Sequence, residues 1–332
     1  MSAALEVSVI TDHTGLPSTG QLGPVDYAAA SKSANTWKAY RSDWQQWSAR
    51  CASQGLDPWQ AQPADVAEWV AELASRYRPS SIGRRVAALS SVYRMAGRPK
   101  AEWSAGGPPT RDDRVRIVLA GIRRAHAAPT KQAAPLTGDL LRQVVADLDL
   151  ERVADVRDGA LLLLGFSAAL RRSELVALDV EDLEFVAGGL RVTVRRSKVD
   201  QEGQGAVVGV PNGERPDTCP VRWLQRWLAV SGIESGPVWR MVDAHGHVRS
   251  GRMAATTVGL VVKRHCERTG LDPVRFSAHS LRSGLATSAA SGGAQVLRLA
   301  DHGRWRSLAT VRGYVRAGAA LDAGNPVRQA GL

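Results

Sequence analysis

The sequence predicts a mainly α-helical chain of two domains, with one small β-hairpin in the second domain. The 332 residues are enough for about two domains, and an apolar content of 44% is ordinary for globular folds. Apolar residues recur at intervals of three and four along most of the chain, as in helices with one buried face. Residues 190–194 and 206–210 alternate instead, which is typical of strands.

Residues 1–22 are small and polar, and we expect a flexible tail there. Residues 23–128 are predicted to form a bundle of at least four helices. The first helix carries an aromatic stripe, which we interpret as core packing in preference to base stacking. The stripe consists of Trp37, Tyr40, Trp44, Trp47 and Cys51.

Three further helices are predicted at residues 63–77, 80–96 and 110–126. The last begins with Thr110-Arg-Asp-Asp113, which resembles a capping box. Four arginines on these helices are candidates for contacts with DNA, although each can equally be a solvated surface charge. Two lie on the predicted polar side of 80–96 and two end the helix 110–126: Arg84, Arg85, Arg123 and Arg124.

The segment 129–136 is predicted to be an interdomain linker, because residues 127–135 read AAPTKQAAP and lack apolar periodicity. Lys131 within it is a further candidate for a phosphate contact. The second domain is expected to span residues 137–332, beginning with a helix capped by Thr137.

The second domain then contains a strongly apolar helix, predicted at 153–170 and ending at Arg171. We expect Arg171 to point inward and Arg172 to lie on the surface, because burying both charges would be costly. The strands 190–194 and 206–210 predict a hairpin with Lys198 near its tip. Two more helices are predicted at 220–230 and 254–268.

The chain is strongly basic, with 43 Lys and Arg against 32 Asp and Glu and a formal net charge of +11. The excess is divided between the halves, at +6 for residues 1–131 and +5 for the rest. This balance favours a polyanionic partner that both domains contact.

Several classes of protein are disfavoured. The three cysteines, Cys51, Cys219 and Cys266, are odd in number and far apart, which favours reduced thiols in a cytoplasmic protein over a disulfide framework. No metal site is predicted, since the pairs His245-Gly-His247 and His265-Cys266 lack a second pair at zinc-site spacing. No signal peptide is recognised, and the longest apolar run, 160–170, is too short to span a bilayer.

Two motifs predict a pocket for an anion. His279 and Arg282 lie three residues apart, on one face of a helix, and so do Arg171 and Glu174. Ser307 is expected to cap a helix that carries a tyrosine about two turns later, with Trp305 in the preceding turn. Two guanidinium groups, an imidazole and an indole N–H suit a phosphate under attack, and the tyrosine is the candidate attacking group.

In their order and spacing these residues resemble the tyrosine recombinase (phage integrase) family. The resemblance covers residues 137–332 by motif and the preceding helices by architecture. The matching positions are Arg171, Glu174, Lys198, His279, Arg282, Trp305 and Tyr314. Many members have His where Trp305 stands; an indole keeps an N–H donor but cannot shuttle a proton, so Trp305 is expected to stabilise charge.

The resemblance implies a helical core-binding domain and a mixed catalytic domain that clamp duplex DNA. It implies attack by Tyr314 to give a 3′-phosphotyrosyl link, with Lys198 protonating the leaving 5′ oxygen. His279 is a candidate acceptor of the phenol proton, and Glu174 is expected to support Arg171 or His279. No cofactor or metal is implied. The implied partners are DNA with inverted-repeat sites and a homo-tetramer on two sites, in the cytoplasm at the nucleoid.

Two alternatives stay open. One is a relative with the same chemistry and another outcome, such as a type IB topoisomerase or a hairpin resolvase. The other is a DNA-binding regulator whose site residues are vestigial. Residues 315–332 are expected to dock on a neighbouring protomer, as the resemblance suggests, or to form a frayed or self-packed tail. The target sequence and the direction of the reaction are not predicted.

Overall fold

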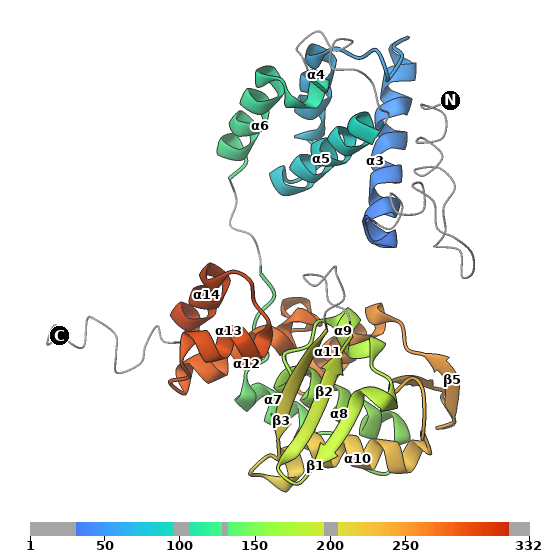
Figure 1. Cartoon of the computed structure of the whole chain (residues 1–332), viewed down its shortest axis with the longest axis vertical. Helices are drawn as coiled ribbons and strands as arrows, with labels where there is room; N and C mark the ends of the chain where they lie inside the picture. Colours follow the sequence, from blue (N-terminus) through green and yellow to red (C-terminus); the bar gives the residue numbers. More distant parts are fainter. Residues whose placement is uncertain (1–30, 96–106, 128–131, 196–204, 319–332) are drawn as a thin grey trace, which may run out of the picture. The chain divides into compact units, whose positions relative to one another are not determined.

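A computed structural model describes residues 31–95, 107–127, 132–195 and 205–318. The chain divides into two compact units, Met1–Thr130 and Lys131–Leu332 (Figure 1). The first is helical where it is described, and the second combines helices with two small antiparallel sheets. The predicted fold class, mainly helical with a small β component, is therefore confirmed.

Four α-helices and one short 3₁₀ helix form the described part of the first unit. They are α3 (Ala34–Ser53), α4 (Pro63–Leu73), α5 (Pro79–Met95), η2 (Pro109–Arg111) and α6 (Asp113–Ala125). Helix α3 packs against α5, and α4 packs against α6. Helix α4 ends four residues before the predicted boundary, because the N–H groups of Arg76 and Tyr77 both donate to the Leu73 carbonyl and close the chain into turns.

The aromatic stripe of α3 faces the core of this unit, which confirms the packing interpretation. Trp37, Trp47 and Cys51 are buried. The Trp47 indole N–H donates to the Tyr93 hydroxyl at 2.9 Å, and that hydroxyl donates to the Pro58 carbonyl at 2.8 Å. The buried rings of Trp47 and Tyr93 thus keep their polar atoms satisfied while their apolar area is removed from water.

The predicted capping box at Thr110 is wrong. Thr110 lies in η2, where its hydroxyl shares a 2.6 Å hydrogen bond with Ser90. Helix α6 is capped by Asp112, whose carboxylate accepts the Arg114 N–H at 2.9 Å. A carboxylate is a strong acceptor and also favours the positive end of the helix dipole, so the later residue caps the helix.

The prediction that Arg85 lies on an exposed, polar side of α5 is wrong. It is buried, and its Nη1 donates to Asp43 Oδ1 at 3.0 Å and to Gln46 Oε1 at 2.6 Å. Its guanidinium also lies over the Tyr77 ring, 4.0 Å from the centroid. Asp43 is buried as well and pairs with Arg84, so two guanidinium groups compensate one buried carboxylate.

The second unit contains eight α-helices in its described part, and three of them, α12, α13 and α14, gather at one end of the unit (Figure 1). No helix in the described ranges is both long and apolar enough to cross a membrane. The helices are α7 (Gly138–Ala146), α8 (Val153–Ser167), α9 (Arg172–Ala177), α10 (Pro220–Ser231), α11 (Ala255–Arg268), α12 (His279–Ser291), α13 (Val296–Gly303) and α14 (Leu308–Gly318), with short 3₁₀ helices η3 (Val180–Asp182), η4 (Pro216–Thr218) and η5 (Pro273–Arg275).

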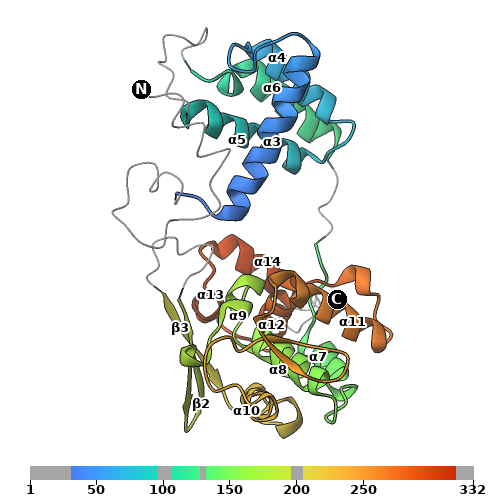
Figure 2. The same cartoon turned by 90° about the vertical axis from the view of Figure 1, so that its right-hand side faces the viewer.

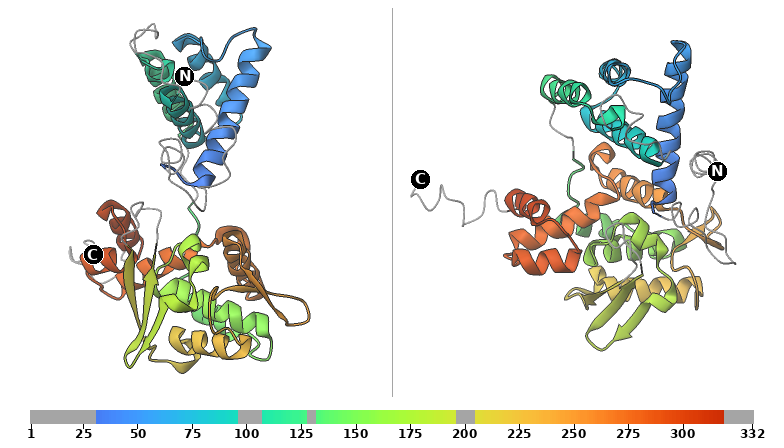
Figure 3. Two further views of the ribbon diagram at one scale, coloured as in Figure 1. Left: turned by 45° about the vertical axis from the view of Figure 1, so that its right-hand side comes forward. Right: turned by 45° about the horizontal axis from the view of Figure 1, so that its top comes forward.

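A three-stranded antiparallel sheet lies along one side of this unit (Figure 2). Its strands are β1 (Leu183–Val186), β2 (Gly189–Val194) and β3 (Ala206–Pro211). The predicted hairpin is confirmed as β2 and β3, with Val192 opposite Val208 and both buried. Strand β1 was not predicted, because it is short and mostly exposed. A second hairpin, β4 (Arg240–Val242) and β5 (Val248–Arg252), lies apart at the periphery (Figure 3).

Helix α8 forms the centre of the core, with Leu161, Leu162 and Leu164 fully buried. It packs closely against α10. Gly159 permits this approach, because a Cβ there would lie 2.1 Å from the Trp223 ring. The apolar run in this part of the sequence is therefore a buried helix of the core.

A buried carboxylate ties α8 to α11. Asp158 is fully buried and accepts hydrogen bonds from Arg157 at 2.7 Å and from His265 Nε2 at 2.8 Å, and it also pairs with Arg264. Burial alone would raise the Asp158 pKa, but the His265 hydrogen bond and the two arginines lower it below its usual value. The cluster thus holds one negative charge inside the domain with several donors.

Helix α12 is positioned by the segment that precedes α7. The Leu136 N–H donates to the Ser280 carbonyl at 2.9 Å, and a Cβ on Gly284 would lie 1.9 Å from the Leu136 carbonyl oxygen. Thr137 occupies the N-cap position of α7 but its side chain makes no capping bond, which corrects the predicted cap. The Gly138 N–H instead donates to Ser288 Oγ on α12 at 2.9 Å, so a neighbouring helix supplies the acceptor.

Candidate active site

The turn after α8 forms one wall of the site. Helix α8 ends at Ser167, not at Arg171 as predicted, because Ala169 adopts a left-handed conformation with φ of 48° that a continuing helix does not allow. Ala168, Ala169 and Leu170 are all buried. Arg171 then begins α9 as its N-cap residue.

Arg171 and Glu174 pair as their spacing predicts. Glu174 Oε2 accepts the Arg171 backbone N–H at 3.0 Å, and Oε1 accepts Nη1 of the same residue at 2.5 Å. The Arg171 side chain is 21% exposed and Arg172 is exposed, as expected, whereas the Glu174 side chain is only 1% exposed. The Glu174 carboxylate therefore holds both the backbone N–H and the guanidinium of Arg171, and it leaves part of the guanidinium accessible.

Arg282 lies on the first turn of α12 and is almost completely buried, with 2% of the residue exposed. Its Nη1 donates to the Ala169 carbonyl, and its Cζ lies 4.2 Å from the centroid of the Trp305 ring. Its Nη2 is buried and has no hydrogen-bond acceptor within the described ranges. A buried donor of this kind is costly to leave unpaired, and an anion bound beside it would satisfy it.

His279 and Tyr314 meet across two helices. Helices α12 and α14 pack together, and Nε2 of His279 lies 3.0 Å from the phenolic oxygen of Tyr314. Ser307 directly precedes α14, and Trp305 lies in the turn before it with its ring 5.7 Å from the Tyr314 ring. The phenol, the imidazole and the indole thus lie together.

Arg304 belongs to the same group, although the sequence did not predict it as a site residue. Its Nη2 donates to Glu174 Oε2 at 2.9 Å, so Glu174 pairs with two arginines. Neighbouring His302 bonds to the Ser167 carbonyl at 2.7 Å and not to the predicted site residues. Arg304 was missed because its partner lies 130 residues away and no local spacing indicates the pair.

The pKa shifts agree with a cluster of positive charge. Burial lowers the pKa of His279, and so do the charges of Arg282 and Arg171. Burial also lowers the pKa of Arg282 to about 9, with a contribution from Arg171. Burial raises the pKa of Tyr314, partly offset by Arg282 and by a hydrogen bond from Trp305. At neutral pH the site therefore combines a neutral imidazole with a protonated phenol.

Glu174 keeps its negative charge despite its burial. Burial would raise its pKa, but the hydrogen bonds from Arg171 and the charge of Arg304 lower it below the usual value. Two arginines therefore pair with this one carboxylate, and Arg282 adds a third positive charge to the cluster. The cluster keeps an excess of positive charge among buried groups, where the effective dielectric is low and a phosphate is attracted more strongly than in water.

The other predicted residues are separate from this cluster. Lys198 and Lys131 lie outside the described residues. Arg84 pairs with Asp43 and is partly exposed, and Arg123 and Arg124 are exposed at the end of α6. These last three side chains belong to the first unit, so their DNA contacts remain predictions.

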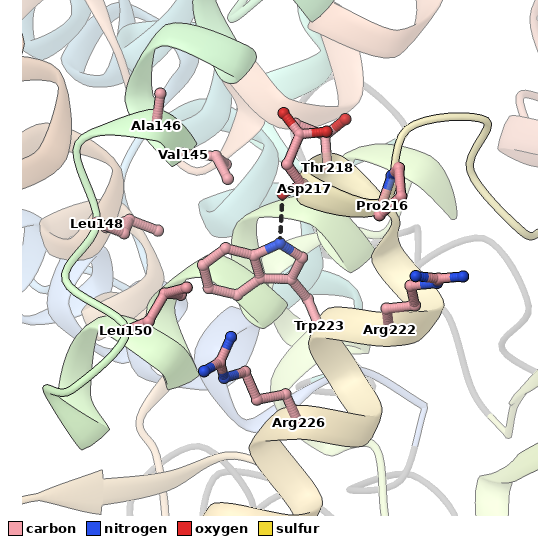
Figure 4. Close-up of a pocket in the computed structure, with 10 residues that line it drawn as sticks. All are labelled: Val145, Ala146, Leu148, Leu150, Pro216, Asp217, Thr218, Arg222, Trp223 and Arg226. Carbon is pink, nitrogen blue, oxygen red and sulfur yellow. Dashed lines mark hydrogen bonds between the residues drawn. The ribbon is translucent and has the colours of Figure 1, made fainter.

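A cavity of about 540 Å³ lies elsewhere in the second unit, between α7, η4 and α10 (Figure 4). Its floor is apolar, with the Trp223 ring beside Leu148 and Leu150, and the indole N–H donates to the Asp217 carbonyl at 2.6 Å. It contains none of the residues of the candidate active site. Within the described ranges, no group of three or more His, Cys, Asp or Glu could hold a metal ion.

The helical bundle, the mixed second unit and the cluster around Tyr314 together define the class of the protein as a tyrosine recombinase. Residues 136–320 match the phage integrase family, and residues 27–100 match the phage integrase N-terminal SAM-like domain. The chain belongs to the phage integrase family and is a DNA recombinase.

Two curated relatives are similar over most of their length. The chain is 34% identical over 289 residues to the integrase/recombinase XerD homolog of Selenomonas ruminantium, covering 87% of this chain and 83% of that protein. It is 22% identical over 305 residues to the recombinase Cre of Escherichia phage P1, covering 86% and 84% of the two chains.

Solved structures have the same fold. XerH recombinase in a post-cleavage complex with a palindromic difH substrate matches with a TM-score of 0.67 at 12% identity, covering 95% of this chain and 91% of that chain. A lambda integrase dimer bound to a core site matches with a TM-score of 0.58 at 16% identity, covering 87% and 91%.

Proposed function

We propose that this recombinase is site-specific and cleaves and rejoins DNA strands through a covalent 3′-phosphotyrosyl intermediate on Tyr314. The observation that carries the proposal is the 3.0 Å contact between Tyr314 and His279, beside a buried Arg282 that has a free donor. A nucleophile, a base and an anion site within one cluster are the parts that phosphoryl transfer requires.

The cleavage step forms one bond to phosphorus and breaks another. The phenolic oxygen of Tyr314 attacks the scissile phosphate, and the bond from phosphorus to the 5′ oxygen breaks. His279 Nε2 accepts the phenol proton, for which a neutral imidazole is needed. Lys198 donates a proton to the leaving 5′ oxygen, a role that rests on the family resemblance. The phosphodiester energy is kept in the tyrosyl ester, so rejoining needs neither ATP nor a metal.

Arg171 and Arg282 stabilise the charge that develops on the phosphate. Glu174 accepts a hydrogen bond from Arg171, and the Ala169 carbonyl accepts one from Arg282. These bonds orient both guanidinium groups before DNA binds. Donors held in place in advance stabilise a transition state without the cost of reorganisation. The Trp305 ring lies against the guanidinium of Arg282, which is almost fully buried, and a cation–π contact holds the two together.

The partner in this proposal is duplex DNA with inverted-repeat sites, bound by both domains at the nucleoid. The net positive charge of both halves supports this, and so do the relatives that are bound to DNA, including one on a palindromic substrate. We also propose a homo-tetramer on two sites, joined through residues 319–332. A protein that recombines at full rate after removal of those residues would contradict this assembly.

A covalent-capture experiment tests the function without knowledge of the target. Host genomic fragments are incubated with the protein, denatured in SDS, and the DNA that stays attached is sequenced. We expect one recurrent sequence with the wild type and none with Tyr314→Phe. Recovery of DNA without any common sequence would favour the topoisomerase alternative, and absence of covalent DNA would favour a regulator with a vestigial site.

A further inference from the structure

Arg304 has an unusual backbone for a residue with a side chain. It ends α13 with φ of 56°, in the left-handed region that glycine adopts most easily. Ala169, with φ of 48°, is the other non-glycine residue with positive φ in the described part of the chain. A glycine at position 304 would relieve the backbone, so the contacts of the arginine side chain have to offset the strain.

Those contacts join three segments of the second unit. Nη2 of Arg304 donates to Glu174 on α9 at 2.9 Å and to the Ala169 carbonyl at 3.5 Å. Nη1 donates to the His302 carbonyl at 3.3 Å and to the Ala168 carbonyl at 3.5 Å. The side chain is only 12% exposed. One guanidinium therefore links the end of α13, the turn after α8 and the start of α9.

Each of the two arginines that face the phosphate site shares a partner with Arg304. The Ala169 carbonyl accepts from both Arg282 and Arg304. The Glu174 carboxylate accepts from both Arg171 and Arg304. Both terminal nitrogens of Arg304 are used in these bonds, whereas its Nε is buried with no acceptor in the described ranges. The bonds that Arg304 makes are with the groups that hold Arg171 and Arg282, and they are the route by which it acts on the reaction in this inference.

We infer that Arg304 is a positioning residue that fixes Glu174 and the Ala168–Ala169 turn, and thereby holds Arg171 and Arg282 in the orientation needed for strand cleavage. The inference rests on the proposed function for its catalytic consequence. Its structural consequence does not depend on cleavage: Arg304 keeps the Ala168–Ala169 turn and the start of α9 ordered. The charge of Arg304 also adds to the positive excess around Arg282.

The decisive variant is Arg304→Gly, because glycine accepts the left-handed backbone and the side chain alone is lost. In single-turnover cleavage at saturating DNA we expect a loss of about 100-fold, the usual effect of misplacing one preorganised donor group. The dissociation constant for DNA should stay within about threefold, because the contribution is made in the transition state. Arg298→Ala, an exposed arginine on the same helix, is the matched control and should cleave at the wild-type rate.

A double-mutant cycle with Glu174→Gln separates positioning from direct action. In the Glu174→Gln background Arg304→Gly should cause clearly less than the loss of about 100-fold expected in the wild type, because only its contribution through the Ala168–Ala169 turn remains. Fully multiplicative losses would overturn the inference, and so would wild-type cleavage by Arg304→Gly. If the glycine variant does not fold, Arg304→Lys replaces it, with at least a tenfold loss expected because an ammonium lacks the planar fork; wild-type activity would overturn the inference.

Hydrogen exchange of the DNA-free protein provides the readout that does not depend on cleavage. In Arg304→Gly the amide of Arg171, which Glu174 holds, should exchange at least tenfold faster, with no change in Arg298→Ala. Unchanged exchange in residues 168–177 would overturn the inference. A wild type that forms no covalent complex would instead contradict the proposed function, so the two failures are distinguishable.

Discussion

Nε2 of His279 lies 3.0 Å from the phenolic oxygen of Tyr314, across two helices and 35 residues of sequence. The imidazole has a lowered pKa, and the phenol has a raised one. The hydrogen bond therefore joins a neutral acceptor to a protonated donor at neutral pH. In the proposed mechanism this pair activates the phenol, which is a weak nucleophile on its own.

The pH dependence of cleavage should follow from the protonation of His279. Because its pKa lies below the usual value of 6.5, His279 is neutral at pH 7 and becomes protonated only under more acidic conditions. A protonated imidazole cannot accept the phenol proton. The single-turnover cleavage rate should therefore fall as the pH decreases through a value below 6.5 and should be constant from there to pH 7.

His279→Gln provides the control for this prediction. Glutamine can still bond to the phenol but cannot take a proton at these pH values. The variant should cleave more slowly, by about 10²–10⁴-fold, and should lose the acidic limb of the profile. An identical acidic limb in the variant would mean that another group is titrating.

If Arg171 and Arg282 stabilise the phosphate as proposed, loss of either should affect the rate far more than the affinity. Arg171→Ala and Arg282→Ala are each expected to reduce single-turnover cleavage by at least 10²-fold, because their donors act on charge that develops in the transition state. The dissociation constant for DNA should change by less than about tenfold, as measured by fluorescence anisotropy. A large loss of affinity with an unchanged rate would show that these side chains only bind DNA.

Gly303 should be required for the position of Trp305. A Cβ on Gly303 would lie 1.6 Å from the Trp305 ring, so Gly303→Ala must displace the indole from Arg282. We expect a decrease of about 10–100-fold in cleavage, since a small misplacement in a site can cost this much. Gly259→Ala is the matched control, because its nearest neighbour would be an ordinary contact at 3.8 Å. Equal activity of the two variants would contradict the role of Trp305.

Lys198 can be tested as the general acid with a modified substrate. Lys198→Ala should cleave ordinary DNA at least about 10²-fold more slowly than the wild type. A bridging phosphorothiolate at the 5′ position should restore the rate to within about tenfold, because a sulfur leaving group does not need a proton. Absence of rescue would remove Lys198 from this role.

The parts of the site that depend on local spacing could be predicted from sequence. His279 and Arg282 lie on one helical face, and Tyr314 lies on the helix after Trp305, because a regular helix fixes these relationships. The pairing of Arg171 with Glu174 follows from the same spacing. The helices of the first unit were also predictable from their apolar periodicity.

The parts that depend on distant partners could not be predicted. Arg304 binds a carboxylate 130 residues away, and Arg85 is buried because Asp43 on another helix compensates it. The left-handed conformation of Ala169 could not be predicted either, since alanine normally favours a right-handed helix. Tertiary contacts overrode the local preference in each case.

The central claim is that Tyr314 becomes covalently attached to the 3′ phosphate of the cleaved strand. The most direct measurement is mass spectrometry of the trapped complex after digestion with nuclease and trypsin, which releases residues 313–316 as a short peptide. We predict that this peptide carries the mass of a phosphodeoxynucleotide on Tyr314 and that Tyr314→Phe gives no adduct. Cleaved DNA with an adduct on another residue, or with an unmodified peptide, would contradict the account.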